Sequence, residues 1–509
     1  MLLIPWFKTP DLSNIPSRKL ATLQQATGSY INTGIVIAQG LLLIPLYLYY
    51  IGAHTYGIWL ASGGMLGILG LVNFGIGSLI IQRISRSYAC QDMAKVVAYF
   101  VNGSLIYLGI ILIYALVGWT ASIWISTILN VTGEEAELLK NCFQVAVLAM
   151  VLGIFNECMR SFAQALLRPI IPMLGMAVGR VLGIGVTVWM LFYNFGLWAI
   201  PAGLLVAEGV IFIFNVLYTF LLLRKLTERM SFDKCILREY LQTSPALLMS
   251  RMGDTLSQES EPLLITIFLS PEVTTAYMVT RRAADIVFRM LNVIVGSTMG
   301  PFSHLAGSSD IEAIRKVVKK LFFISFSAGA IGLASYVGAN HIFVPLWTGE
   351  LFILDQNIVI FIALGFFARS LRGLLGQMLY GLGDFSYTSI VVLLEGVIRI
   401  AMSLGLLSIF GIIGVPLAFV LSCLVAMLVL AVRLKNKLMM DFNLSVIIRF
   451  LFSGSVLFGI AMVLPQMELS VDSWSGFVLY LLTLLASVIT TYMLMNWTRC
   501  CNIYRSIVK

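Results

Sequence analysis

Long apolar segments separated by short polar connections run through the whole chain. Hydrophobic residues make up 59% of the 509 residues and charged residues only 11%, which is too apolar for a protein whose surface must meet water. Each segment is long enough to cross the ~30 Å hydrocarbon core of a bilayer as an α-helix. The sequence therefore predicts an all-α membrane protein with fourteen transmembrane helices. They are expected at residues 28–50, 56–80, 97–119, 138–164, 170–193, 197–223, 243–269, 273–300, 321–344, 357–380, 386–409, 412–432, 446–464 and 474–496.

Charged residues in the connections orient these helices. Basic side chains gather in the connections on one side of the membrane, while the opposite connections are acidic or neutral, and positively charged connections stay in the cytoplasm. We therefore expect both termini in the cytoplasm. The net charge of +9 reflects this orientation, so no nucleic-acid partner is expected. Basic clusters on the cytoplasmic side include Arg83, Arg86 and Lys95; Arg224, Lys225 and Arg229; Arg315, Lys316, Lys319 and Lys320; and Arg433, Lys435 and Lys437.

The two halves of the chain share landmarks. GLWAIP at 196–201 and GIIGVP at 411–416 occupy the same turn-to-helix position. Each half has six predicted helices, an even number, so an axis along the membrane normal relates them. We expect two homologous six-helix lobes around a central cavity, plus two C-terminal helices. The expected domains are a cytoplasmic N-terminal segment (1–27), the N-lobe (28–223), a cytoplasmic linker (224–242), the C-lobe (243–435), and two extra helices with a cytoplasmic tail (436–509).

Two predicted helices near the middle of the chain carry eight ionisable side chains. Charges at the centre of lipid-facing helices cost roughly 3 kcal/mol each, or on the order of 20 kcal/mol for eight. They must therefore line a polar path, which indicates transport in a protein this apolar. Helical periodicity places most of each set along one face. The first helix carries Arg251, Asp254, Glu259 and Glu261, and the second carries Arg281, Arg282, Asp285 and Arg289.

A structural alternative is that these charges form ion pairs that hold the helix bundle together. It explains single pairs one helical turn apart, but it explains the whole set poorly, because hydroxyls and amides would join helices at lower cost. Elsewhere, Glu395 and Arg399 are one turn apart and predict a structural pair. Arg369 and Arg372 lie in a predicted helix with no acid nearby in the sequence.

Cysteine and histidine positions predict neither disulfides nor a metal centre. The seven cysteines show no framework spacing, and most fall in apolar segments or on the cytoplasmic side. The three histidines, His54, His304 and His341, are scattered along the chain. We therefore expect no metal and no other cofactor.

Several short segments resemble a known family of membrane transporters. They include IPLYLYYIG at 44–52, YGIW at 56–59, LGLVNFGIG at 69–77, RISR at 83–86 and PLLITIFLS at 262–270. Over roughly residues 20–435 the chain is similar to the Wzx-type polysaccharide transporters (lipid-linked oligosaccharide flippases) of the multidrug/oligosaccharidyl-lipid/polysaccharide exporter superfamily. Many members have twelve helices, although fourteen also occur, for example in the lipid II flippases. Those carry an arginine-rich first helix pair that is absent from the spans here, which argues against lipid II as substrate.

The resemblance implies a flippase, not an enzyme. Members move undecaprenyl-diphosphate-linked oligosaccharides, such as O-antigen, capsule or exopolysaccharide repeat units, outward across the bacterial cytoplasmic (inner) membrane by alternating access. The implied partners are this substrate, membrane lipid, H⁺ or Na⁺ as coupling ion, and the glycosyltransferases or glycan polymerase of the same biosynthesis.

Phosphate chemistry then assigns roles to the eight charges. Guanidinium forks match the geometry of phosphate, and carboxylates compete for the same guanidinium groups unless a cation neutralises them. The expected substrate-binding residues are Arg251, Arg281, Arg282 and Arg289, and the expected ion-coupling residues are Asp254, Glu259, Glu261 and Asp285.

Two other functions are open to such a chain. A cation-coupled multidrug or small-molecule antiporter of the same superfamily would favour acids in its cavity, whereas the helix at 273–300 is net basic. A membrane-embedded glycan-modifying enzyme is the other. A polymerase needs a large external domain, and the longest external loop here is roughly twenty residues; an acyltransferase needs a buried histidine, and none is expected in mid-span.

Overall fold

The structure, a computed structural model, confirms an all-helical protein. It describes residues 18–69, 76–226, 231–307, 311–439, 452–460 and 473–497, and these residues contain helices and turns but no strand. The chain divides into two compact units, Met1–Thr255 and Leu256–Lys509, which we call unit 1 and unit 2. Several predicted features lie outside the described residues: most of the N-terminal segment, part of the linker, most of the helix at 446–464 and the C-terminal tail.

Unit 1 contains the first seven helices and the beginning of the eighth. The helix α8 (Lys234–Phe268) starts in unit 1 and ends in unit 2. The other helices of unit 1 are α1 (Arg18–Tyr50), α2 (Ala53–Leu69), α3 (Ile76–Ala89), α4 (Met93–Ile128), α5 (Glu134–Ala165), α6 (Ile170–Phe192), the 3₁₀ turn η3 (Gly196–Trp198) and α7 (Ala199–Leu226).

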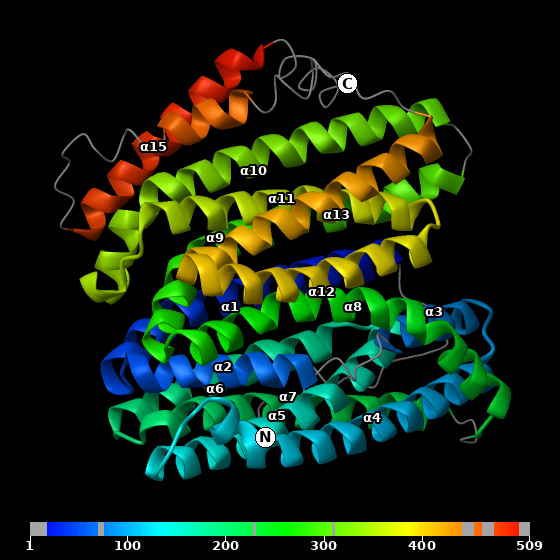
Figure 1. Ribbon diagram of the computed structural model, residues 1–509. Coiled ribbons are helices and arrows are strands. Elements are labelled where there is room, and N and C mark those ends of the chain that lie inside the picture. Colours follow the sequence, from blue (N-terminus) through cyan, green and yellow to red (C-terminus); the bar gives the residue numbers. More distant parts are fainter. Residues whose placement is uncertain are drawn as a thin grey trace. The chain divides into compact units, whose positions relative to one another are not determined.

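Unit 2 contains the remaining helices. Within it, α10, α11 and α13 run side by side, and α15 lies against α10 (Figure 1). Its elements are α9 (Pro271–Gly307), α10 (Ile311–Thr348), η4 (Glu350–Phe352), α11 (Gln356–Gly381), α12 (Phe385–Phe410), η5 (Gly411–Ile413), α13 (Gly414–Leu438), a helix at 452–460 and α15 (Trp474–Met495).

Nine helical stretches of the described chain are long and apolar enough to cross a membrane. One of them, Phe385–Leu438, covers two of the predicted helices. The predicted helices at 243–269 and 273–300 are present as α8 and α9, which their charges set apart from the apolar stretches. The protein is therefore a multi-pass membrane protein, and the number of fourteen crossings stays a prediction.

Small residues let the helices of unit 1 approach one another closely. A Cβ atom added at Gly179 in α6 would come 2.7 Å from the carbonyl oxygen of Ala207 in α7, and one at Gly183 would come 2.6 Å from that of Gly203. Close backbone approach of this kind replaces the hydrophobic driving force that lipid-embedded helices lack. The glycine spacing of α6 therefore explains why α6 and α7 form an extensive contact.

The same turn precedes a helix in each unit. Gly196 begins η3 with φ +57°, and Gly411 begins η5 with φ +59°. Glycine adopts this left-handed backbone without the steric penalty of a Cβ atom. The segments at 196–201 and 411–416 thus share both sequence and geometry, as the internal repeat predicts.

The helix α11 forms the centre of unit 2. It packs against α9, α10 and α13, and its side chains Ile362, Ala363 and Phe366 are at most 1% exposed. This helix also carries Arg369 and Arg372, both buried. Two arginines therefore lie in the most enclosed helix of the unit, where they require anionic partners.

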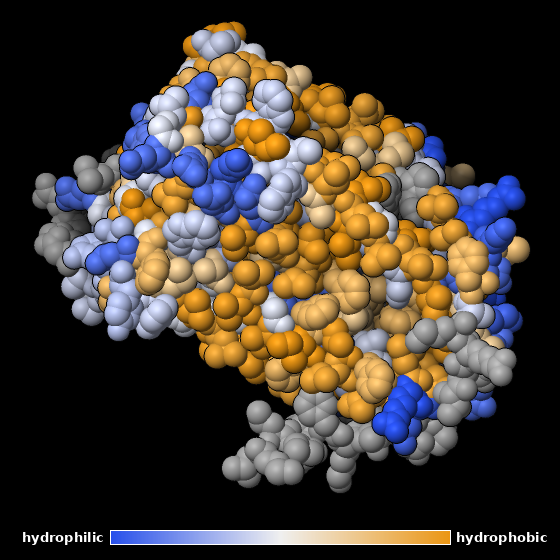
Figure 2. All heavy atoms as spheres, turned by 90° about the horizontal axis from the view of Figure 1, so that it is seen from below, coloured by the Kyte–Doolittle hydropathy of each residue, from blue (hydrophilic) through white to orange (hydrophobic). Residues whose placement is uncertain are grey.

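The outer surface carries apolar side chains that a soluble protein would bury. Figure 2 shows one face with a broad apolar area and hydrophilic residues at its margins. In α4, exposed side chains include Leu108, Leu112 and Leu116. Lipid tails solvate such a surface, while the helical backbone satisfies its own hydrogen bonds.

Candidate functional site

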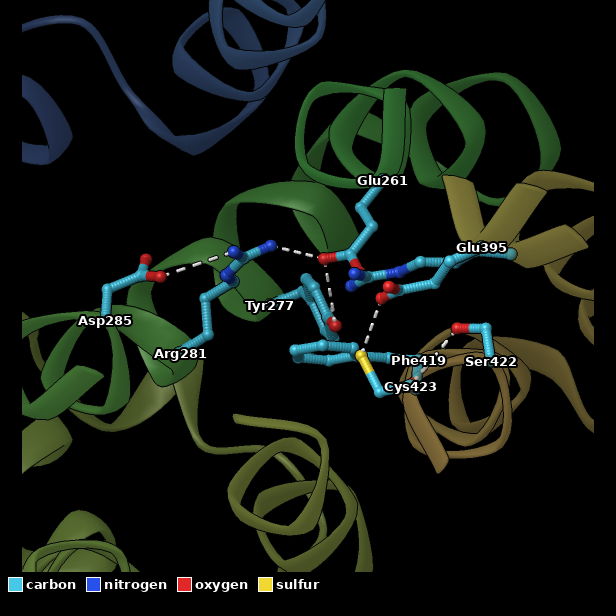
Figure 3. A network of polar contacts seen from close by, with 9 residues as sticks. Glu261, Tyr277, Arg281, Asp285, Glu395, Phe419, Ser422 and Cys423 are labelled. Carbon is cyan, nitrogen blue, oxygen red and sulfur yellow. Dashed lines mark hydrogen bonds and ion pairs between the residues drawn. The ribbon is translucent and has the colours of Figure 1, made fainter. Parts of the chain in front are cut away.

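Glu261 is the centre of a buried ion-pair network in unit 2 (Figure 3). Its side chain, near the end of α8, is 1% exposed. One carboxylate oxygen accepts a hydrogen bond from Nη1 of Arg281 in α9, and the other accepts one from Nη2 of Arg399 in α12. A single carboxylate therefore joins three helices through two guanidinium groups.

Two further side chains complete this part of the network. Arg281 Nη2 lies 3.3 Å from Oδ1 of Asp285, one turn further along α9. The Tyr277 hydroxyl donates to Oε2 of Glu261 at 3.3 Å. The guanidinium of Arg281 is thus shared between two carboxylates, and no free face is directed toward solvent because the side chain is 5% exposed.

Two of the arginines in this network also contact the faces of aromatic rings. The Arg399 guanidinium carbon lies 3.7 Å from the centre of the Phe419 ring, and that of Arg281 lies 5.4 Å from the centre of the Phe366 ring. A Cβ atom at Gly365 would come 2.4 Å from Phe419, so glycine at this position makes room for the ring. Cation–π contact of this kind stabilises a desolvated guanidinium.

A second group of charges lies beside the first. Arg372 Nε of α11 is 3.0 Å from Oε2 of Glu395 in α12. The Cys423 thiol of α13 donates to the other oxygen of Glu395 at 3.0 Å. We expected Glu395 to pair with Arg399; in the structure Glu395 pairs with Arg372 and Arg399 pairs with Glu261. The structure therefore has two ion pairs between helices in place of the expected pair within α12.

The network balances its own charge. Three arginines (Arg281, Arg372 and Arg399) face three acids (Glu261, Asp285 and Glu395). Burying an unpaired charge is so unfavourable that such groups occur in pairs. None of the histidine, cysteine, aspartate and glutamate side chains in the described ranges form a cluster suited to a metal ion.

The structure brings together part of the predicted site. Glu261, Arg281 and Asp285 are in direct contact, and Glu259 is close enough to feel the charges of Arg281 and Asp285. Arg282 is half-buried and Arg289 is exposed, on the same helix as Arg281. Arg282 and Arg289 are therefore more accessible than Arg281, which is held by two carboxylates.

Arg251 and Asp254 belong to unit 1, because the boundary between the units falls after Thr255 in α8. Arg251 is exposed and acts electrostatically on Tyr107 in α4. Asp254 is half-buried and has contacts within the described protein. The contacts described above around Glu261 all come from residues of unit 2.

Unit 1 has a smaller polar cluster of its own. Asn156 Nδ2 donates to Oε2 of Glu208 at 2.8 Å, and Asn215 Nδ2 donates to Oδ1 of Asn156 at 3.2 Å. Arg180 acts on Glu208 electrostatically, while its Nη1 donates to the carbonyl oxygen of Asn32 at 3.2 Å. In unit 1 an amide therefore donates the hydrogen bond to the buried carboxylate, whereas in unit 2 guanidinium groups contact the buried carboxylates.

Solved structures of transporters have the same fold. An inward closed conformation of the lipid II flippase MurJ is similar with a TM-score of 0.70 and 13% identity, covering 94% of this chain and 99% of that one. An inward-facing multidrug resistance transporter of the MATE family in the MOP superfamily has a TM-score of 0.64 and 16% identity over 79% of this chain and 94% of its own. A MATE transporter in complex with MaL6 has a TM-score of 0.61 and 14% identity, covering 83% of this chain and 97% of that one.

The fold is the one seen in flippases and multidrug transporters of known structure. The chain belongs to the polysaccharide biosynthesis protein family, which matches residues 63–342. No curated protein matches the sequence. The resemblance that the short sequence segments indicate is thereby confirmed at the level of family and fold.

Proposed function

We propose that this protein flips polyprenyl-diphosphate-linked oligosaccharides from the cytoplasmic to the outer leaflet of the bacterial inner membrane. Three observations support the proposal: the family is one of polysaccharide biosynthesis, the fold is shared with a lipid II flippase, and charged side chains are embedded in apolar helices. The basic connections lie in the cytoplasm in this proposal, and the lobes comprise residues 28–223 and 243–435.

The observation that carries the mechanism is the sharing of Arg281 between two carboxylates. Arg282 and Arg289, on the same helix, are less enclosed, and they make the first contacts with the diphosphate. Arg281 can bind the diphosphate only after Glu261 or Asp285 releases it. Arg251, exposed on α8, contributes a further cationic contact.

Competition for arginine links substrate binding to cation binding. A proton or Na⁺ that neutralises Glu261 or Asp285 leaves Arg281 with unused donors, which a phosphate oxygen can accept. Cation and substrate therefore strengthen each other's binding, and the linkage is reciprocal. Glu259 and Asp254 belong to the same set of ion-coupling acids in this mechanism.

Outward release is favoured by the membrane potential. An inside-negative potential drives an anion outward by ~2.3 kcal/mol per charge per 100 mV. When the carboxylates pair again with Arg281 and Arg399, they expel the diphosphate. The oligosaccharide, whether O-antigen, capsule or exopolysaccharide unit, contacts uncharged polar walls, and the prenyl chain stays in lipid.

A cation-coupled antiporter for drugs is the second candidate, because multidrug transporters of the MATE family share the fold. The net basic character of α9 opposes it. The test is a strain that lacks this protein. The flippase predicts lost surface glycan and lipid-linked oligosaccharide retained on the inner leaflet; the antiporter predicts normal glycan and increased drug susceptibility, which would overturn the proposal.

A further inference from the structure

A concavity lies at the amino end of α10, away from the ion-pair network. Its volume is about 520 Å³, within the range of small-molecule sites. Residues 312, 315, 316 and 319 are spaced by three and four, so one helix face supplies the polar wall. The lining residues are Ile311, Glu312, Arg315, Lys316 and Lys319.

One wall of the concavity is fixed by hydrogen bonds. Arg315 Nε donates to the carbonyl oxygen of Leu438 at 2.7 Å, and its Nη2 donates to that of Met439 at 3.0 Å. These carbonyls end α13, where the helix leaves its last acceptors unsatisfied. Met439 itself has φ +47°. The guanidinium therefore locks the end of α13 against the start of α10.

The opposite face of α10 is anchored in the core. Ile314 and Val318 are buried among Leu375 and Leu434 and neighbouring apolar side chains of α11 and α13. This burial fixes the rotation of α10 and keeps Lys316 and Lys319 on the outside. The two lysines therefore lie on the exposed face of a helix whose rotation is fixed by packing.

The positive charge of the concavity is only partly neutralised. Lys316 lies 3.1 Å from Glu312, but both side chains are more than three-quarters exposed, and exposed pairs of this kind contribute little. Three basic residues and one acid line the space. Nearby, Arg433 and Lys437 are engaged by Asp384.

The position along α10 indicates the kind of anion. The helix has 38 residues, whereas about 20 residues cross the hydrocarbon core. Its basic first turns precede the apolar stretch, which begins directly after Lys320. Cations that directly precede the apolar stretch of a membrane-spanning helix lie at the depth of the lipid headgroups, next to the start of the acyl chains.

We propose that this concavity binds the phosphodiester headgroup of an anionic membrane phospholipid. Lys316 and Lys319 contact the phosphate, Arg315 shapes the wall, and the acyl chains extend from there along the apolar part of α10 that follows Lys320. The bound lipid ties α10 to the end of α13 from outside. The site is independent of the substrate that the protein moves.

Lipid binding to the full-length protein tests this proposal. Phosphatidylglycerol is titrated in detergent, with phosphatidylcholine as the neutral lipid, and bound lipid is counted by native mass spectrometry. The variant Lys316→Gln/Lys319→Gln keeps Arg315 and hence the α13 contact. The control Arg224→Gln/Lys225→Gln removes two exposed basic residues at the end of α7.

The wild type and the control should bind phosphatidylglycerol alike and prefer it to phosphatidylcholine. The lysine variant should bind it about 5-fold more weakly per lysine lost, or about 30-fold in total, as a contribution of about 1 kcal/mol per basic residue implies. Equal affinity in the lysine variant, or an equal loss in the control, would overturn the site. Displacement of the lipid by millimolar inorganic phosphate would overturn the lipid assignment in favour of a soluble anion.

Discussion

Glu261 on α8 accepts a hydrogen bond from Arg399 on α12, a residue 138 positions further along the chain. The same carboxylate accepts from Arg281 on α9. One acid thus forms ion pairs with two arginines that are each at most 5% exposed. Whatever changes the charge of Glu261 changes the state of both arginines, which makes this residue the point of control in the proposed mechanism.

Glu261→Gln should destabilise the protein strongly. The amide cannot compensate two buried guanidinium groups, and removing one partner of a buried ion pair costs about 3–5 kcal/mol. Thermal unfolding in detergent measures the loss. The matched control is Glu350→Gln, at an exposed acid in η4, which should leave the unfolding temperature within error. Equal unfolding temperatures for the two variants would contradict the central role of Glu261.

Arg372 and Glu395 should behave as a coupled pair. Arg372→Met leaves a buried carboxylate, and Glu395→Gln leaves a buried guanidinium, so each single variant should lose about 3 kcal/mol or more of unfolding free energy. The double variant should lose less than the sum, because it removes both charges. A double-mutant cycle in urea gives the coupling energy. Additive effects would show that the 3.0 Å ion pair contributes nothing.

Asp384, directly before α12, gives the start of this helix a pH-dependent attachment to α13. Hydrogen bonds from Arg433 and Lys437 of α13 hold the pKa of this carboxyl below its ordinary value. A lowered pKa stabilises the fold above about pH 4 and loses that contribution as the pH falls through the folded-state value. Asp384→Asn should therefore lower stability by about 1 kcal/mol or less at pH 7, and the difference from wild type should shrink as the pH falls below about 4 and be lost below the folded-state pKa. A difference that persists at acid pH would exclude this cause.

Asp285→Asn should increase the affinity for a diphosphate anion. The change removes one of the two carboxylates that hold Arg281, and it leaves the buried Glu261 pair intact. The variant should bind a polyprenyl diphosphate more tightly than the wild type does, because Arg281 then has unused donors. Unchanged affinity in a folded variant would refute competition for Arg281.

The sequence predicted the fold class and part of the candidate site for identifiable reasons. The length of an apolar segment is sufficient to predict a membrane helix. Charged residues inside such a segment can be recognised even when their partners are unknown. Arg281 and Asp285 are one turn apart, so helical periodicity was sufficient to pair them. The repeated glycine turns at 196 and 411 were likewise visible as local sequence.

Partners on other helices could not be predicted in the same way. Arg399 pairs with Glu261 and Arg372 pairs with Glu395 across helices, and sequence spacing carries no information about such contacts. The sequence carries only an indirect indication of them. Arg369 and Arg372 have no acid nearby in the sequence, so a buried arginine in this helix requires a partner from a distant part of the chain. Burial also separated Arg281 from Arg282, adjacent residues that look equivalent in the sequence.

The most direct test of the account measures flipping in proteoliposomes. A fluorescent polyprenyl-diphosphate-linked oligosaccharide is reconstituted with the protein, and its appearance in the opposite leaflet is followed with and without an imposed potential. The wild type should flip it, faster when the potential favours outward movement of an anion. Arg282→Ala should lose about tenfold or more, the effect of removing a charge-assisted hydrogen bond, whereas Arg224→Ala should not. Flipping by Arg282→Ala at the wild-type rate, with equal protein in the membrane, would contradict the account.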